Sequence, residues 1–329
     1  MVTIPSNSEA ARPFRPGSVR AKPRLMRILF IGPNRVGDAV LSTGLLDHLI
    51  RAHPGAKITI ACGRPAAGVF ARLPGCEGIL VVDKRPWDLH WLPLWSWAVR
   101  RRWDLVVDIR GSALGFIVWS RRRAVMRPRP GHKIAQLGAV LRLDPPPAPV
   151  AWIGAEDQAR AASLLPADRP LIALGPTANW PPKAWPPAAF AALFQALAAG
   201  PLPGAIAVVL GGPGPAERAL ADPLLALLPG AIDLCGQLSL PEAAACLTRA
   251  RLFVGNDSGL MHLAAAAGVP TVGIFGPTDP AVYAPIGPYA AAVTGASGAI
   301  ADVTVAEVRA TAEALLARAA SPRHAIGAG

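Results

Sequence analysis

The chain has 329 residues, 52% of them hydrophobic, which is enough apolar material for two domains of ordinary size. Its formal net charge of +12 is unevenly spread: eighteen Lys and Arg face eight Asp and Glu between residues 28 and 150, but nine face twelve in residues 151–329. This asymmetry indicates an anionic partner for the first half. Four cysteines without CxxC spacing argue against a zinc ribbon or a disulfide framework and favour a cytoplasmic setting.

Residues 1–25 predict a disordered basic tail, and Met26 is a candidate start of the protein. The tail has arginines and scattered prolines without an apolar core, so it is not typical of a secretory signal. Later uncharged runs, at 184–216 and 258–278, are interrupted by Pro and Gly. They predict no transmembrane helix.

Residues 26–150 alternate short apolar strands with helical patterns, which predicts a parallel sheet covered on both faces. Strands are expected near Ile28, Ile58, Ile79 and Leu105, and helices at 38–51, 66–73, 89–101 and 112–121. The proline-rich segment 144–149 predicts an extended linker, and we place the domain boundary there.

Residues 151–329 repeat the alternation. Helices are expected at 155–165, 187–199, 216–228, 241–249, 259–267 and 305–319, with strands at 170–174, 205–210, 232–234, 252–255 and 271–275. The predicted fold is therefore α/β, with two doubly wound Rossmann-like domains facing across a cleft where a ligand would bind.

A strand followed by Gly-Asn-Asp-Ser-Gly at 255–259 leads into an uncharged helix. The free N–H groups of such a helix start favour an anion, typically a phosphate. A similar strand, turn and helix opens the first domain at 27–50. The spacing of the two units suggests two similar halves that face one another.

Four segments resemble glycosyltransferase family 9, the ADP-heptose:lipopolysaccharide heptosyltransferases. They are Ile-Gly-Pro-Asn-Arg-Val-Gly-Asp at 31–38, Lys-Ala-Trp-Pro at 183–186, Leu-Gly-Gly-Pro through Glu217 at 210–217, and 255–262 with Gly-Pro-Thr-Asp-Pro at 276–280. The resemblance covers essentially the whole chain after Met26. It implies the GT-B fold, an acceptor-binding domain at 26–150, a donor-binding domain at 151–329, and inverting glycosyl transfer without a metal or another cofactor.

The resemblance also implies roles for individual residues. Asp38 is expected to be the general base and Lys183 to contact the donor diphosphate, so these are the catalytic candidates. The donor-binding candidates are Thr177, Lys183, Glu217, Asp257, Ser258, Gly259 and His262. The acceptor-binding candidates are Asn34, Arg35, Arg110, Arg121, Arg122 and Arg123.

Structural alternatives stand beside these roles. Asp38 and Asp257 could simply cap helices, His262 could be packed in the core, and Lys183 could be solvated. Asp279 is expected to shape a turn. No DxD-type acidic pair, HExxH motif or histidine cluster predicts a metal site, and the missing GxGxxG motif weighs against a dehydrogenase.

The stretch from Trp87 to Trp103 contains five of the nine tryptophans, and Arg100, Arg101 and Arg102 stand near its end. Trp87, Trp91 and Trp95 share one face if the segment is helical. That face could contact a membrane interface or be buried against the sheet. A second basic stretch runs from Arg121 to Lys133 and could engage phosphates of a lipid-linked glycan; no nucleic-acid fold accompanies it.

The sequence thus predicts a cytoplasmic enzyme, monomeric and peripheral at the inner face of the inner membrane, that moves heptose from ADP-heptose to an anionic lipopolysaccharide core acceptor. Three alternatives remain: transfer from another nucleotide sugar, epimerisation of a nucleotide sugar without an acceptor, and nucleotide-sugar binding without catalysis.

Overall fold

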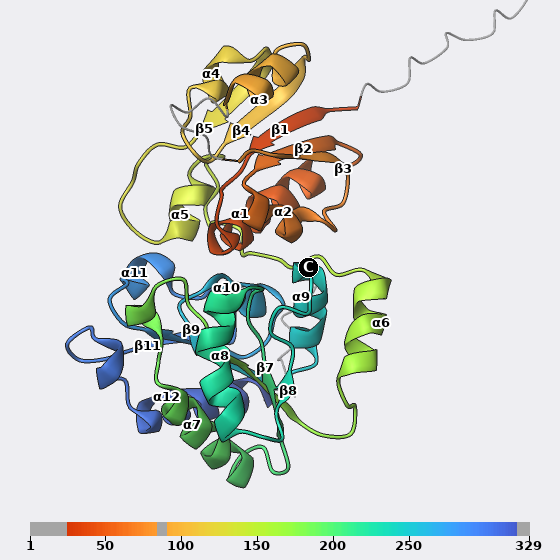
Figure 1. Ribbon diagram of the computed structural model, residues 1–329. Coiled ribbons are helices and arrows are strands. Elements are labelled where there is room, and N and C mark those ends of the chain that lie inside the picture. Colours follow the sequence, from red (N-terminus) through yellow and green to blue (C-terminus); the bar gives the residue numbers. More distant parts are fainter. Residues whose placement is uncertain (1–24, 84–90, 321–329) are drawn as a thin grey trace, which may run out of the picture.

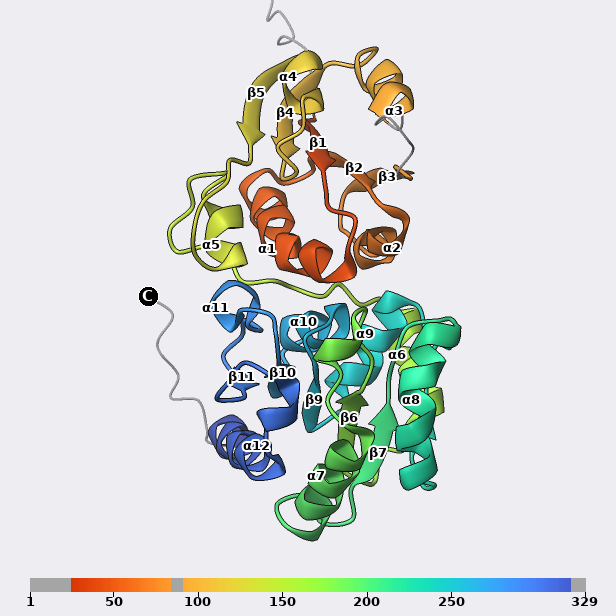
Figure 2. The same cartoon turned by 60° about the vertical axis from the view of Figure 1, so that its left-hand side comes forward.

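The computed structural model describes residues 25–83 and 91–320, which form two stacked lobes (Figures 1 and 2). Residues 1–24 of the predicted tail and Trp87 lie outside the described residues. Each lobe has its own parallel sheet with helices on both faces. The predicted α/β fold with two doubly wound domains is confirmed.

The sheet of the first lobe has the strand order β3-β2-β1-β4-β5, and all pairs are parallel. The four expected strands are present. The sheet is built from β1 (Arg27–Ile31), β2 (Lys57–Cys62), β3 (Cys76–Val81), β4 (Trp103–Asp108) and β5 (Ser120–Val125).

The expected helix at 112–121 is wrong. Only one helical turn forms there, α4 (Leu114–Ile117), and the chain then extends into β5 beside β4. Three consecutive arginines fit this strand because it lies at the edge of the sheet, where their side chains are exposed.

Helices cover both faces of the first sheet. On one face lie α1 (Val36–Ala52), α2 (Arg64–Ala67) and η1 (Gly68–Phe70), and α3 (Trp91–Ala98) lies with α4 on the other. A further short helix, α5 (Lys133–Gly138), packs beside α1. The buried side of α3 carries Leu94 and Ala98, Trp91 and Trp97 pack partly buried against the same cluster, and Trp95 is exposed.

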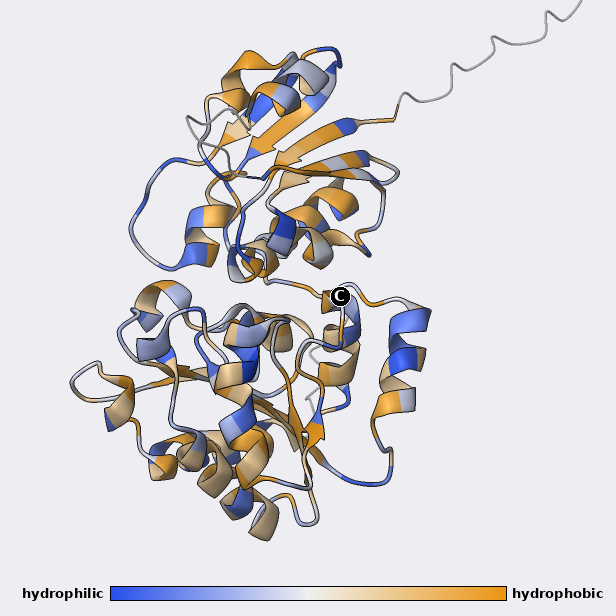
Figure 3. Cartoon of the chain, in the orientation of Figure 1, coloured by the Kyte–Doolittle hydropathy of each residue, from blue (hydrophilic) through white to orange (hydrophobic). Residues whose placement is uncertain are grey.

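The second sheet has the order β11-β10-β9-β6-β7-β8, again all parallel, and most of its strand residues are hydrophobic (Figure 3). Its strands are β6 (Leu171–Gly175), β7 (Ile206–Val209), β8 (Ile232–Asp233), β9 (Leu252–Asn256), β10 (Thr271–Phe275) and β11 (Ala290–Thr294). One face carries α6 (Ala155–Leu164), α9 (Leu240–Thr248) and α10 (Gly259–Ala266), and the other carries α7 (Pro187–Ala199), α8 (Pro215–Leu227) and α12 (Val305–Ala320). Short helical turns complete the lobe: η3 (Pro181–Lys183), α11 (Pro280–Tyr283) and η4 (Ile300–Asp302).

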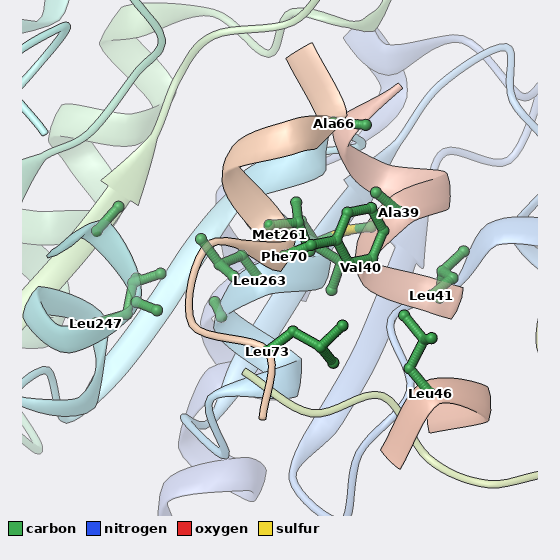
Figure 4. Close-up of a cluster of buried hydrophobic side chains, with 14 of the residues drawn as sticks. Ala39, Val40, Leu41, Leu46, Ala66, Phe70, Leu73, Leu247, Met261 and Leu263 are labelled. Atoms are coloured by element: carbon green, nitrogen blue, oxygen red, sulfur yellow. The ribbon is translucent and has the colours of Figure 1, made fainter. Parts of the chain in front are cut away.

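The two lobes share one buried apolar cluster, part of which is drawn in Figure 4. Val40, Phe70 and Leu73 of the first lobe belong to it together with Met261 and Leu263 of α10. Apolar side chains removed from water on both sides of an interface hold the lobes together.

An ion pair borders this shared cluster. The Arg72 guanidinium donates to both carboxylate oxygens of Asp157, each at 2.9 Å, and Asp157 is only 2% exposed. The same carboxylate accepts the backbone N–H of Gly154 at the start of α6. Arg72 therefore joins the first lobe to the point where the second begins.

The segment that connects the lobes packs against α1 and is hydrogen-bonded to it. It has no helix or strand between residues 144 and 154, in agreement with the expected extended linker. The N–H of Val150 donates to Thr43 Oγ1 at 2.8 Å, and a Cβ added at Gly44 would lie 2.4 Å from the carbonyl oxygen of Pro147. Only glycine permits this close approach.

Across the described ranges, no helix combines the length and the hydrophobicity that a bilayer crossing requires. The four cysteines are free thiols.

Candidate active site

The N-termini of α1 and α10 meet where the two lobes touch. A Cβ added at Gly259 would lie 2.8 Å from Cβ of Val36 and 3.1 Å from the backbone nitrogen of Gly37, and one added at Gly37 would lie 3.1 Å from Cδ2 of His262. The two glycines therefore allow the helix starts to approach closely. Since each helix start carries partial positive charge, this place favours an anion.

Lys183 and Asp257, both predicted at the donor site, form an ion pair. Lys183 Nζ lies 2.6 Å from Oδ2 of Asp257, and Thr278 Oγ1 donates to the same oxygen at 2.8 Å. The side chains are 15% and 8% exposed. Asp257 is not a helix cap, because the N-cap of α10 is Ser258.

Asn256 holds the loop that presents Lys183. Its Oδ1 accepts the N–H of Trp185 at 3.0 Å, and its Nδ2 donates to the carbonyl of Pro176 at 2.7 Å. Both ends of the loop at 176–185 are thus tied to the last residue of β9. Lys183 is held beside Asp257 by the backbone and is not a freely solvated surface residue.

Two buried polar atoms lie at the start of α10. Ser258 Oγ and His262 Nδ1 have no hydrogen-bond partner among the described residues. Burial lowers the pKa of His262 to about 4, although the negative charge of Asp257 opposes the shift. The imidazole is therefore neutral near pH 7. Buried polar atoms normally have partners, so these two atoms are candidates for contact with a ligand.

Thr177 and Glu217 lie at the ends of neighbouring strands. Thr177 is buried after β6, and a Cβ added at Gly211 would lie 2.9 Å from its Cγ2. Glu217, in the first turn of α8, accepts the N–H of Gly212 at 2.9 Å. The structure places them after the carboxyl ends of β6 and β7, and β6 is the neighbour of β9, which ends at Asn256.

Asp38 lines a cavity of about 220 Å³ in the first lobe. It does not cap α1, since the N-cap is Arg35 and no side-chain hydrogen bond caps the helix. Arg110 also lines the cavity and donates to Oδ1 of Asn34 at 2.9 Å. The lining residues are Pro33, Asn34, Asp38, Ile109, Arg110, Lys133 and Leu137.

Tyr283 is a site residue that we did not predict, and Lys133 was expected only as a member of the basic stretch, not beside Asp38. Lys133 is the last member of the basic stretch after β5, and its position in the cavity comes from α5. Tyr283 ends α11, and its pKa is raised by burial and by the carboxylates of Asp38 and Asp257, with Arg35 opposing. The negative charges of one carboxylate from each lobe thus both act on this phenol.

Arg121, Arg122 and Arg123 are not close to Asp38. They are exposed on the first half of β5, where Arg122 pairs with Leu105 near the start of β4. The cavity lies beyond the opposite ends of the strands, after β1 and β4. Arg35 is exposed at the start of α1 and is not part of the cavity lining.

Asp279 has the turn-shaping role expected of it. It is the N-cap of α11, and its Oδ1 accepts the N–H of Ala281 at 2.8 Å.

As for metals, no group of three or more His, Cys, Asp or Glu side chains in the described part of the chain could hold an ion.

Comparison with known proteins identifies the family of this chain. The family model described as glycosyltransferase family 9 (heptosyltransferase) matches residues 123–309. Lipooligosaccharide heptosyltransferase 2 of Haemophilus ducreyi is 26% identical over 328 residues, covering 86% of this chain and 93% of that protein.

Two solved structures share the fold. A family 9 glycosyl transferase from Veillonella parvula has a TM-score of 0.77 at 21% identity, covering 89% of this chain and 97% of its own. The ADP-heptose lipopolysaccharide heptosyltransferase II of E. coli has a TM-score of 0.74 at 22% identity, covering 90% and 100%. The family match extends over more than half of the chain and confirms the resemblance in the motifs. This chain is a glycosyltransferase and belongs to glycosyltransferase family 9, the heptosyltransferase family.

Proposed function

We propose that this enzyme transfers heptose from ADP-heptose to a lipopolysaccharide core acceptor, with inversion at the anomeric carbon. The observation that carries the proposal is the opposition of Asp38 in the first lobe to the start of α10 and the Lys183–Asp257 pair in the second, across the contact between Gly37 and Gly259. An inverting transfer needs a base on one side of the reacting carbon and a site for a departing diphosphate on the other.

We assign the donor to the second lobe. The diphosphate would lie at the N-terminus of α10, where Ser258 Oγ and the backbone N–H groups can donate to it. His262, being neutral, would offer Nδ1 to a hydroxyl or phosphate group of the donor. Lys183 would move its ammonium from Asp257 to the diphosphate, and Thr177 and Glu217 would border the nucleotide. The proposed donor agrees with the ADP-heptose named for the E. coli structure.

We assign the acceptor to the Asp38 cavity of the first lobe. Arg110 and Lys133 supply positive charge for an anionic sugar, and Asn34 is held in place by Arg110. The basic excess of this lobe supports an anionic partner. Arg121, Arg122 and Arg123 would contact the acceptor only through a part of it that extends along the lobe, away from the reacting hydroxyl.

In the proposed reaction, Asp38 accepts the proton of the acceptor hydroxyl as that oxygen bonds to the anomeric carbon of the donor. The bond from the same carbon to the diphosphate oxygen breaks, and ADP leaves with the electron pair. The starts of α1 and α10 and the Lys183 ammonium stabilise the charge that develops on the leaving group. Because these groups can stabilise the leaving diphosphate as a metal ion would, we propose metal-independent transfer.

We also propose the setting of the reaction. A monomer working in the cytoplasm, peripherally at the inner face of the inner membrane, would meet its lipid-linked acceptor there. Nucleic acid is not proposed as a partner.

The test is a panel of nucleotide sugars measured for binding by calorimetry and then for turnover with a deacylated core acceptor, with and without EDTA. We expect ADP-heptose to bind best and ADP to be released only when acceptor is present. Turnover of donor without acceptor would favour an epimerase, and binding without any turnover would favour a binding protein. Either result, or better binding and transfer with another nucleotide sugar, overturns the proposed reaction, and loss of turnover in EDTA overturns metal independence.

A further inference from the structure

Large apolar side chains are exposed on the outer end of the first lobe. They come from α3 and α4, which lie at the end of this lobe away from the second (Figures 1 and 2). We call them the aromatic cap: Leu92 (57% exposed), Trp95 (39%), Phe116 (60%), Ile117 (56%) and Trp119 (68%). Exposed apolar side chains concentrated in one region usually mark an interaction site.

The aromatic cap rests on a rigid base. Beneath it Leu94, Ala98, Leu114 and Val118 are buried in one cluster with the first sheet. The backbone N–H of Trp103 donates to the carbonyl of Trp119 at 3.0 Å, which joins the segment after α4 to β4. The cap is therefore presented by packed secondary structure.

Arginines surround the cap. Residues 91–123 contain seven arginines and two aspartates. Asp108 is fully buried, and Asp104 is engaged by the backbone N–H of Arg27 and, at 3.7 Å, by Arg121. This part of the surface is strongly positive. The exposed arginines are Arg100, Arg102, Arg110, Arg121, Arg122 and Arg123.

A hollow of about 610 Å³ lies at the C-terminal end of α3, lined by Ser96, Trp97, Arg100 and Arg101. The guanidinium of Arg101 lies 3.8 Å from the centre of the Trp97 ring and donates to the Trp97 carbonyl. A hydroxyl and arginine side chains beside an indole suit a phosphate headgroup at a membrane interface.

We propose that the aromatic cap docks this enzyme on an anionic lipid bilayer. Leu92, Phe116 and Ile117 would enter the acyl boundary, where they leave no polar group unpaired, and Trp95 and Trp119 would lie at headgroup depth. The arginines would pair with lipid phosphates. This inference rests on the membrane setting in the proposed function and identifies the surface responsible for it.

The position of α3 connects the docking surface to the acceptor cavity. At one end of the helix, the guanidinium of Arg110, which lines the cavity, lies 4.7 Å from the centre of the Trp91 ring. At the other end lie the hollow and Arg100. The eight residues of α3 span about 12 Å. A lipid-anchored acceptor would therefore reach Asp38 from the docked bilayer past the Trp91 end of α3.

The test is flotation of the full chain with phosphatidylethanolamine vesicles that contain phosphatidylglycerol, and with neutral phosphatidylcholine vesicles. We expect at least tenfold stronger partitioning to the anionic vesicles, weakened by salt. The triple variant Phe116→Ser, Ile117→Ser, Trp119→Ser should lose about tenfold or more, and Arg100→Gln with Arg102→Gln should lose a similar factor. The control Leu227→Ser, a 48% exposed leucine on α8 of the other lobe, should bind like the parent.

Parent protein that does not bind anionic vesicles, or a triple variant that binds as well as the parent, overturns the inference. The inference is also overturned if neither protein binds vesicles and the parent sediments as a dimer while the triple variant sediments as a monomer. Transfer to a short water-soluble acceptor without vesicles should be unchanged in the triple variant. If the parent lacks this transfer but binds vesicles, the proposed reaction fails and the docking surface stands.

Discussion

The ammonium of Lys183 lies 2.6 Å from Oδ2 of Asp257, so the cation proposed for the donor diphosphate is paired with a protein anion. The same oxygen accepts the hydroxyl of Thr278. Because Asp257 keeps this second donor, it is not left without a partner when Lys183 moves to a phosphate. Lys183 can thus exchange one anion for another while Asp257 keeps a hydrogen bond, although that carboxylate loses the positive charge of the lysine.

Lys183→Ala should weaken ADP binding about 10- to 100-fold, the usual cost of losing a hydrogen bond to a charged group. Lys183→Arg should recover part of the affinity because it restores the charge. Calorimetry with ADP measures both variants. Lys57→Ala, which removes an exposed lysine on β2, is the matched control; equal affinity for Lys183→Ala and the parent would remove Lys183 from the donor site.

Asp38→Asn should lower kcat about a hundred- to ten-thousand-fold, because the amide cannot accept the proton of the acceptor hydroxyl. The dissociation constant for ADP should stay close to that of the parent. Turnover with a soluble acceptor and calorimetry are the two measurements. Asp47→Asn changes a partly exposed carboxylate of the same helix that pairs with Arg51 and should transfer normally; a parental rate for Asp38→Asn would show that Asp38 is not the base.

Gly259→Ala should destabilise the protein by about 1–3 kcal/mol through overpacking, since its Cβ would lie 2.8 Å from Val36. We also expect slower transfer, because the starts of α1 and α10 must move apart. Urea unfolding and kcat test the two effects. Gly230→Ala, whose Cβ would meet nothing within 4 Å, should change neither quantity, and similar behaviour of the two variants would contradict this account of the contact.

The imidazole of His262 should remain neutral at every pH above about 5, because burial lowers its pKa from 6.5 to about 4. The unfolded chain then binds more protons than the folded one between those values, so the folded state loses stability as pH falls from about 6.5 towards 4. His262→Gln should flatten this part of the stability curve. Thermal unfolding between pH 4 and 7 measures the slope, and identical slopes for parent and variant would show that His262 is protonated equally in both states.

Hydrophobic periodicity was sufficient to predict five of the six strands of the second sheet and its large helices, because buried parallel strands and helix faces repeat at fixed spacings. It missed the edge strand β11, most of whose residues are only partly buried. It failed at β5, whose arginines conceal an edge strand that is recognisable only once β4 lies beside it. The short helices α5 and α11 were missed for a related reason: a turn or two of helix has too few residues to show a period.

The motif resemblance led to Asp38, Lys183 and Asp257, since each stands in a conspicuous segment after a strand. It did not lead to Lys133 or Tyr283, which enter the site through α5 and α11. When several basic residues lie close together in the sequence, the local sequence does not show which of them lines a cavity. Conversely, Arg121, Arg122 and Arg123 are conspicuous in sequence, but the direction of β5 carries them away from Asp38.

The contact between the lobes is asymmetric. On the side of η1 and α9 it combines apolar packing with the bidentate Arg72–Asp157 pair, whereas on the side of α5 and α11 His132 Nε2 meets the carbonyl of Ala284 at 3.0 Å. Separation of the first side would expose hydrocarbon and leave the Asp157 carboxylate without its guanidinium, and separation of the second would break a hydrogen bond that water can replace. We therefore expect the lobes to rotate apart about a hinge at the Arg72–Asp157 pair. Sugar and nucleotide would then enter and leave by the edge next to His132.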